Sequence, residues 1–162
     1  MSLYIINLLI SRDKGEDLKI QQEDLTKCIK LINKELKTSK TAAPCLSISL
    51  RFTNISNMKK LNSCYSGINR ETNVLSFLPN LKETDENNNL VGDIAICVDV
   101  LKKEAKEQNK ICLDHLLHLF LHGVLHLMGF GHDSDEEALE METLEKKILS
   151  KLGIEDPYQI EL

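Results

Sequence analysis

Tryptophan is absent from this 162-residue sequence, and aromatic residues make up only 4% of it. The hydrophobic core must therefore be built mainly from Leu and Ile. Hydrophobic residues still amount to 42% and charged residues to 28%, which is close to the average for soluble globular proteins. This length is enough to bury one substantial core. We therefore expect one domain over residues 1–162.

Long apolar runs are also missing. No segment reaches the roughly 18 uninterrupted apolar residues that a membrane helix needs, so the sequence predicts no membrane span. The apolar run Leu3–Ile10 has no basic residue before it and no small-residue cleavage site after it. It therefore predicts a buried strand rather than a signal peptide.

Cysteines are few and lack paired spacing. Their number is odd and no C-x-x-C pair occurs, which argues against a disulfide framework and against a thiolate zinc site. A reducing cytoplasm is the environment that this pattern favours. The cysteines are Cys28, Cys45, Cys64, Cys97 and Cys112.

An excess of positive charge is absent as well. The formal net charge is −5, so the chain as a whole does not attract nucleic acid, and RNA binding would need a local basic patch. One lysine series offers such a patch, but Glu104 and Glu107 interrupt it, and a solvated helix face is the simpler interpretation. These lysines are Lys102, Lys103, Lys106 and Lys110.

Hydrophobic periodicity predicts an α+β domain in which a small mixed sheet packs against several helices. Asp99 is expected to cap the third helix, Ser134 and Glu137 to form a capping box for the last helix, and Gly153 to end it. A polar loop is expected over Asn80–Asn89. The predicted strands are 3–10, 46–52, 74–78 and 91–98, and the predicted helices are 21–36, 54–65, 100–109, 113–127 and 134–152.

All five histidines fall between residues 115 and 132, and this cluster is the clearest functional signal. His122 and His126 are four residues apart on a predicted helix, so they differ by only about 40° around its axis and project from one face. Gly129 permits a left-handed turn at the helix end. With Gly131 it lets the chain fold back and bring His132 to the same point. The spacing therefore predicts a metal site with His122, His126 and His132 as its ligands.

Three neutral imidazoles that leave one open position are typical of catalytic zinc, which lowers the pKa of a bound water to about 7. We expect one Zn²⁺ ion, because an all-nitrogen site suits zinc best. The spacing H-x3-H-x5-H is that of the metzincin proteases, except that their general-base Glu is replaced by Gly123. His115 and His118 lie near the same helix face. We interpret them as packing or supporting residues, since such a site needs only three protein ligands.

The segment His118–His132, HLFLHGVLHLMGFGH, resembles the signature of the YbeY family of metal-dependent, single-strand-specific endoribonucleases. Leu61–Phe77, LNSCYSGINRETNVLSF, resembles the second signature of that family, and Gly92–Ile94, GDI, resembles a third. The three matches occur in the order found in the family and span the chain from Leu61 to about Leu149.

Membership would imply a metzincin-like α+β fold, a zinc cofactor and a cytoplasmic role in ribosomal RNA maturation and ribosome quality control. The implied partners are single-stranded RNA, in particular ribosomal RNA, and the small ribosomal subunit or its associated factors, but not DNA. Two alternatives remain open. One is a metzincin-like zinc peptidase, and the other is a ribosome-associated binding module that zinc merely stabilises.

Two positions depart from the family pattern. The arginine that usually follows the tyrosine of the second signature is replaced by Ser66. Arg70 is a candidate catalytic cation in its place, although an ordinary surface arginine explains it equally well. The Tyr-Asp pair before the third ligand is replaced by Phe130-Gly131, which removes one possible anchor for a ligand.

Overall fold

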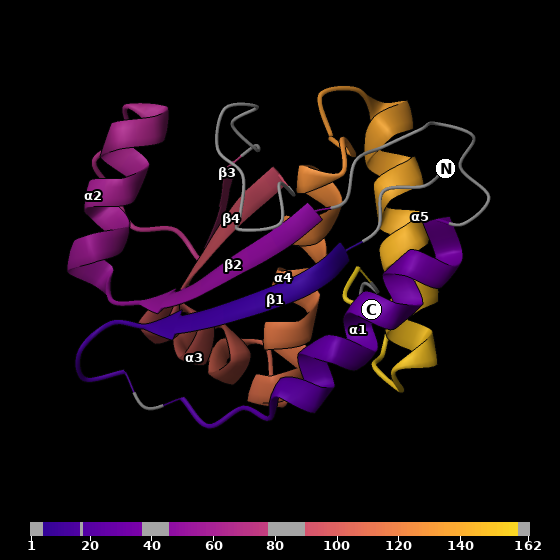
Figure 1. The fold of residues 1–162 in the computed structure, drawn as a ribbon, viewed down its shortest axis with the longest axis horizontal. Helices are drawn as coiled ribbons and strands as arrows, with labels where there is room; N and C mark the ends of the chain where they lie inside the picture. The colour runs from indigo at the N-terminus through magenta and orange to yellow at the C-terminus, as the bar shows by residue number, and fades with distance from the viewer. Residues whose placement is uncertain (1–4, 17, 37–45, 78–89, 159–162) are drawn as a thin grey trace.

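The computed structural model describes residues 5–16, 18–36, 46–77 and 90–158. Within these ranges the chain forms four strands and five helices, in the order predicted (Figure 1). They are β1 (Ile5–Arg12), α1 (Gln22–Leu36), β2 (Leu46–Thr53), α2 (Ile55–Ser66), β3 (Val74–Phe77), β4 (Leu90–Cys97), α3 (Val98–Glu107), α4 (Cys112–Leu127) and α5 (Asp135–Lys151). Leu3 and the predicted loop Asn80–Asn89 lie outside the described residues.

The strands form one mixed sheet in the order β1-β2-β4-β3. The pairs β1–β2 and β2–β4 are parallel, whereas β3 runs antiparallel to β4 at the edge. Side chains alternate between the two faces, as a strand's period of two requires. Ile48, Leu50 and Phe52 of β2 are therefore all buried in the main core. The predicted mixed sheet and α+β fold are confirmed.

Helix α4 is the central helix of the domain. It is apolar around most of its circumference, which is typical of a helix buried on all sides. One side contacts β3 and β4, and other sides contact α1, α3 and α5 (Figure 1). Met58 of α2 packs with Ala95 and Cys97, which alternate along β4 with the core residues Ile94 and Ile96. Helix α2 therefore covers the sheet face opposite to α4.

Two predicted helix starts had different outcomes. The prediction that Asp99 caps the third helix is wrong, because α3 already begins at Val98 and Asp99 lies in its first turn. Val98 is fully buried in the core, so β4 passes directly into the helix. Ser134 caps α5 as predicted, since its Oγ accepts a hydrogen bond from the backbone N–H of Glu137 at 3.2 Å. The carboxylate of Glu137, however, accepts from the N–H of Asp133.

The sequence predicts no disulfide framework and no membrane span. All the cysteines in the described ranges are free, namely Cys28, Cys64, Cys97 and Cys112. In the same ranges, no helix has both the length and the apolar character needed to cross a bilayer.

Asp13 ties the end of β1 to β2 and α2. Its carboxylate accepts hydrogen bonds from Arg51 at 2.8 and 3.1 Å, from Thr53 Oγ1 at 2.5 Å and from Asn57 Nδ2 at 2.8 Å. Partial burial alone would raise the pKa of this carboxyl. The three partners outweigh that effect and lower the pKa from 3.8 to about 2.

Asp13→Asn should therefore lower the free energy of unfolding near neutral pH by about 1–2 kcal/mol. A pKa lowered by one pH unit corresponds to about 1.4 kcal/mol, and the full effect is reduced here because solvent screens the partly exposed Arg51. A lowered folded-state pKa stabilises the fold above pH 4, and this contribution disappears as the pH falls towards 2. Urea unfolding at several pH values between 6 and 3 should show that the difference in free energy of unfolding between parent and variant becomes smaller as the pH falls. Glu107→Gln, on the exposed face of α3, is the control. A gap that stays constant with pH would contradict the assignment.

Candidate metal centre

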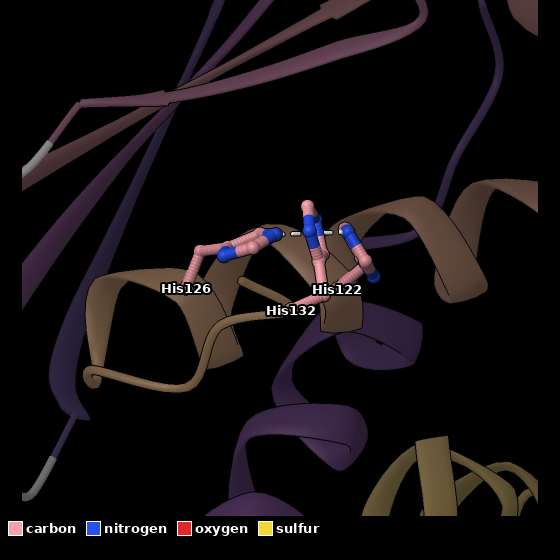
Figure 2. Close-up of side chains that lie close together, drawn as sticks. All are labelled: His122, His126 and His132. Atoms are coloured by element: carbon pink, nitrogen blue, oxygen red, sulfur yellow. Dashed lines mark hydrogen bonds between the residues drawn. The ribbon is translucent and has the colours of Figure 1, made fainter. Parts of the chain in front are cut away.

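Three histidine rings converge beside the end of α4 (Figure 2). His122 and His126 lie on successive turns of that helix, with their Nε2 atoms 3.0 Å apart. His132 comes from the following segment, and its ring centroid lies 4.9 Å from that of His126 and 5.9 Å from that of His122. One ligand atom from each ring falls within 4.8 Å of the others. The structure thus brings together the three predicted ligands.

A glycine turn at the end of α4 makes this convergence possible. Gly129 has φ +97°, the left-handed conformation expected at this position. Its N–H donates to His126 O at 3.1 Å, and the N–H of Phe130 donates to Leu125 O at 3.0 Å. This pair of bonds is the Schellman motif. The turn reverses the chain directly after the second histidine and places His132 beside the first two.

The hydrogen bonds behind the rings determine which nitrogens carry protons. Nδ1 of His126 lies 3.0 Å from the carbonyl of Phe130, and Nδ1 of His122 lies 2.5 Å from Oε1 of Glu145. A carbonyl and a carboxylate are acceptors, so both Nδ1 atoms donate. Each neutral ring then carries its lone pair on Nε2. Burial, and the neighbouring His122 and His132, lower the pKa of His126, which favours this neutral form.

The two Nε2 atoms lie 3.0 Å apart, and with both rings neutral their lone pairs would repel unless a proton or a metal ion lay between them. Two nitrogens bound tetrahedrally to zinc at about 2.0–2.1 Å are about 3.3 Å apart, close to the observed separation. Imidazole nitrogen is also a common ligand of zinc. The donor atoms present at this site consequently fit a metal ion.

Glu145 is a residue of this site that the sequence analysis did not identify. It lies on α5, its side chain is fully buried, and it contacts the back of His122. Its other oxygen accepts from Tyr158 Oη and lies 3.4 Å from Nε2 of His118. Burial alone would raise the pKa of this carboxyl, but the hydrogen bonds from His118, His122 and Tyr158 lower it to about 2. It is therefore a carboxylate at neutral pH.

A signal for Glu145 was present in the sequence. It occupies the buried face of α5, where the neighbouring helical positions are apolar, and a buried carboxylate requires partners. The other buried residues on this face are Met141, Ile148 and Leu149.

His115 and His118 lie one to two turns before His122 on α4, and His118 lines the same pocket. Nε2 of His115 is 3.1 Å from Oε1 of Glu104, which also accepts from Asn73 Nδ2 at 3.0 Å. His118, His122 and Glu145 form a second group with metal-ligand spacing, but their hydrogen bonds to one another occupy the atoms concerned. Both extra histidines thus lie against carboxylates, in the supporting positions expected for them.

The converging rings open into a pocket of about 320 Å³. This is at the lower end of the range of about 300–1,000 Å³ that is usual for ligand pockets. Among the described residues that line it, none is Asp, Glu, Lys or Arg. Arg70 and Ser66 are exposed and do not belong to this lining. The lining residues are Asn73, Val74, Ser76, His118, Leu119, His122, His126, His132 and Tyr158.

Gly123 lies at a close contact between α4 and the sheet. A Cβ at this position would lie 3.0 Å from Ser76 Oγ and 3.3 Å from two side-chain carbons of Ile94. Ser76 Oγ also donates to the carbonyl of Gly123 at 3.0 Å. A glutamate at position 123, where metzincins keep their general base, would crowd the side chains of Ser76 and Ile94, which would have to shift to admit it.

The fold and the donor set define an α+β protein with a three-histidine centre able to hold a metal ion. The chain belongs to the YbeY family: the family model described as endoribonuclease YbeY matches residues 10–153. The resemblance found in the histidine segment and in the two upstream segments is thereby confirmed.

Individual relatives agree with this assignment. An endoribonuclease YbeY from Bartonella henselae is 40% identical over 158 residues, covering 96% of this chain and 98% of the relative. An endoribonuclease YbeY from Colwellia psychrerythraea is 49% identical over 111 residues, or 68% of this chain and 71% of the relative. The solution structure of TM1509 from Thermotoga maritima shares the fold, with a TM-score of 0.54 at 21% identity, covering 94% of this chain and 99% of that one.

Replacing His122, His126 or His132 singly with Ala should remove most of the bound metal, because each change removes one of three ligands. The measurement is the metal content per chain, by mass spectrometry of elements, after equilibration with zinc and gel filtration. His115→Gln is the matched control, since it keeps a donor for Glu104 and should retain the metal. Near-stoichiometric zinc in His126→Ala would refute the ligand assignment.

Proposed function

We propose that this chain, over residues 1–162, is a zinc-dependent, single-strand-specific endoribonuclease of the cytoplasm that acts in ribosomal RNA maturation and ribosome quality control. The observation that carries the proposal is the convergence of His122, His126 and His132 in the lining of a pocket, with one ligand atom from each within 4.8 Å of the others. The name endoribonuclease YbeY, carried by relatives at 40–49% identity, supports RNA as the substrate.

Bound zinc would supply a Lewis acid for a phosphodiester oxygen and lower the pKa of water in the pocket. The protein contributes the fixed orientation of the ligands. Glu145 and the carbonyl of Phe130 hold His122 and His126 with their lone pairs towards the pocket. Leu119 and Val74 give the pocket apolar walls, which exclude water and strengthen the electrostatic interactions inside it.

A phosphodiester is an anion, and the described lining supplies no lysine or arginine to neutralise it. We propose Arg70 for this role. Its backbone is fixed because Asn62, a buried residue of α2, donates from Nδ2 to Arg70 O at 2.8 Å. Its side chain is exposed, and it lies three residues before Asn73 in the pocket wall. Binding of RNA would then bring the guanidinium over the phosphate.

The structure also bears on the peptidase alternative. A metzincin-like peptidase needs a carboxylate beside the metal as general base. The described pocket lining contains no acidic residue, and Glu145 is fully buried with its oxygens already hydrogen-bonded. Gly123 stands where metzincins keep that base, and a Cβ at this position would crowd Ser76 and Ile94. The binding-module alternative differs from the proposed function in one respect: it requires zinc but no catalysis.

An unstructured single-stranded RNA should be cut by the zinc-loaded protein, left intact after chelation, and cut again when zinc is restored. Peptide substrates should survive, because the described pocket lining has no general-base carboxylate. The DNA oligonucleotide of the same sequence should also survive, because it lacks the 2′-hydroxyl group that distinguishes RNA. A fluorescent end label followed on denaturing gels provides the measurement, and His126→Ala is the control for contaminating nuclease. Zinc-dependent peptide hydrolysis would favour the peptidase instead. Tight zinc binding without RNA cleavage would favour the binding module.

Arg70→Ala should lower the rate of RNA cleavage at saturating substrate by a factor on the order of 10²–10³, the usual loss when one transition-state contact is removed. Zinc content should not change, because the arginine is not a ligand. Ser66→Arg should raise the parent rate or rescue Arg70→Ala. Lys60→Ala, an exposed lysine of α2, controls for a general loss of positive charge. An unchanged rate in Arg70→Ala would rule out this cation.

A further inference from the structure

We propose that Glu145 and Tyr158 are positioning residues of the metal centre. In this arrangement Tyr158 holds the Glu145 carboxylate, and the carboxylate in turn fixes His122 in the orientation that binds metal. The segment 154–158 is then part of the metal site, although it contributes no ligand. The inference rests on the proposed metal-binding role of His122, His126 and His132.

The geometry around Glu145 is that of a shared hydrogen-bond acceptor. Oε1 receives the N–H of His122 at 2.5 Å, while Oε2 receives the hydroxyl of Tyr158 and lies 3.4 Å from Nε2 of His118. The side chain has no exposed surface, so water cannot replace a lost partner. Leaving a buried charge with fewer partners is costly, and this holds the three donors in place.

Tyr158 reaches Glu145 because the chain after α5 is fixed at several points. Gly153, with φ +77°, ends the helix in a Schellman turn, and Ile154 then packs against the core. The N–H of Tyr158 donates to Asp156 Oδ1 at 2.8 Å. Lys146 of α5 lies 3.7 Å from Asp156 and 5.9 Å from the centre of the Tyr158 ring. The hydroxyl is therefore presented from an ordered backbone.

The ring of Tyr158 also contacts the site directly. It packs edge-on against His118, with ring centroids 5.7 Å apart, and it lines the pocket with His122. The match to the family model ends at residue 153, so this wall of the pocket lies outside the matched segment.

The physical role of the Glu145–His122 bond is to select one imidazole tautomer. Without an acceptor at Nδ1, the proton can move to Nε2, and the ring can rotate. In the first case an N–H group faces the metal position, and in the second case no nitrogen faces it. The metal needs a lone pair of Nε2 there. Loss of a hydrogen-bond partner behind a metal ligand typically weakens metal affinity 10–100-fold.

The test compares zinc dissociation constants, measured by competition with a chromophoric chelator, for the parent protein and four variants. Glu145→Ala removes the acceptor and should weaken zinc binding about 100-fold. Tyr158→Phe removes only the hydroxyl, and Glu145→Gln keeps an amide oxygen for His122 but offers Tyr158 an N–H. Each of these should weaken binding about tenfold. Glu140→Gln makes the same charge change at an exposed position of α5 and should match the parent.

A second readout separates positioning from a general loss of stability. Long-range ¹⁵N–¹H spectra of the metal-free protein should show His122 with its proton on Nδ1 in the parent and in Glu140→Gln. Glu145→Ala should show a mixture of tautomers, and Glu145→Gln should largely restore the parent form. Thermal unfolding of the metal-free variants identifies any that are poorly folded. If Glu145→Ala does not fold, Tyr158→Phe carries the test, because it removes one oxygen from a partly exposed ring.

Equal zinc affinity in parent, Tyr158→Phe and Glu145→Gln would overturn this inference and leave the proposed metal site intact. Failure of the parent itself to bind zinc would refute the proposed function and this inference together. Weaker zinc binding in the two conservative variants, with parent-like unfolding temperatures, would support the positioning role.

Discussion

The close packing of α4 against the sheet at Gly123 is the constraint on which the site depends. Because no side chain separates the helix from Ser76 and Ile94, α4 lies deep in the domain, and its histidine face meets α5 and the pocket. A residue with a Cβ at position 123 would press on the side chains of Ser76 and Ile94 and disturb this packing beside His122. The glycine that distinguishes this chain from the metzincin motif thus favours close packing of α4 on the sheet, independently of the reaction.

The metal centre combines groups with opposite requirements. The pocket wall is partly apolar, yet Nδ1 of His122 and of His126 each needs an acceptor if the Nε2 lone pair of the same ring is to point at an ion. Two different groups meet this need: the carbonyl of Phe130, which the Gly129 turn provides, and the buried carboxylate of Glu145. Phe130-Gly131, in place of the family Tyr-Asp, therefore leaves His126 anchored through the backbone. The loss of the aspartate therefore leaves the orientation of His126 intact, although the sequence alone suggests a weaker anchor for a ligand.

Much of the fold could be predicted because its signals are local. Alternation in β2, helical spacing in α1 and the serine cap of α5 each depend on a few neighbouring residues, and the spacing of His122, His126 and His132 encodes one helix face and one turn. Glu145 and Tyr158 could not be placed in this way. They reach the site only because α5 and the residues after it fold back against α4, which is a long-range contact. The wrong cap at Asp99 has a similar origin, since burial of Val98 in the core decided where α3 begins.

The position of Glu145 and Tyr158 along the chain has a consequence for synthesis. A ribosome makes the polypeptide from its N-terminus, so the three histidines emerge before the carboxylate and the hydroxyl that orient them. Until residues 145–158 are released, His122 has no acceptor behind it, and the metal centre is incomplete. A nascent chain that has exposed residues 122–132 but not yet residues 145–158 therefore carries its ligands without the groups that orient them.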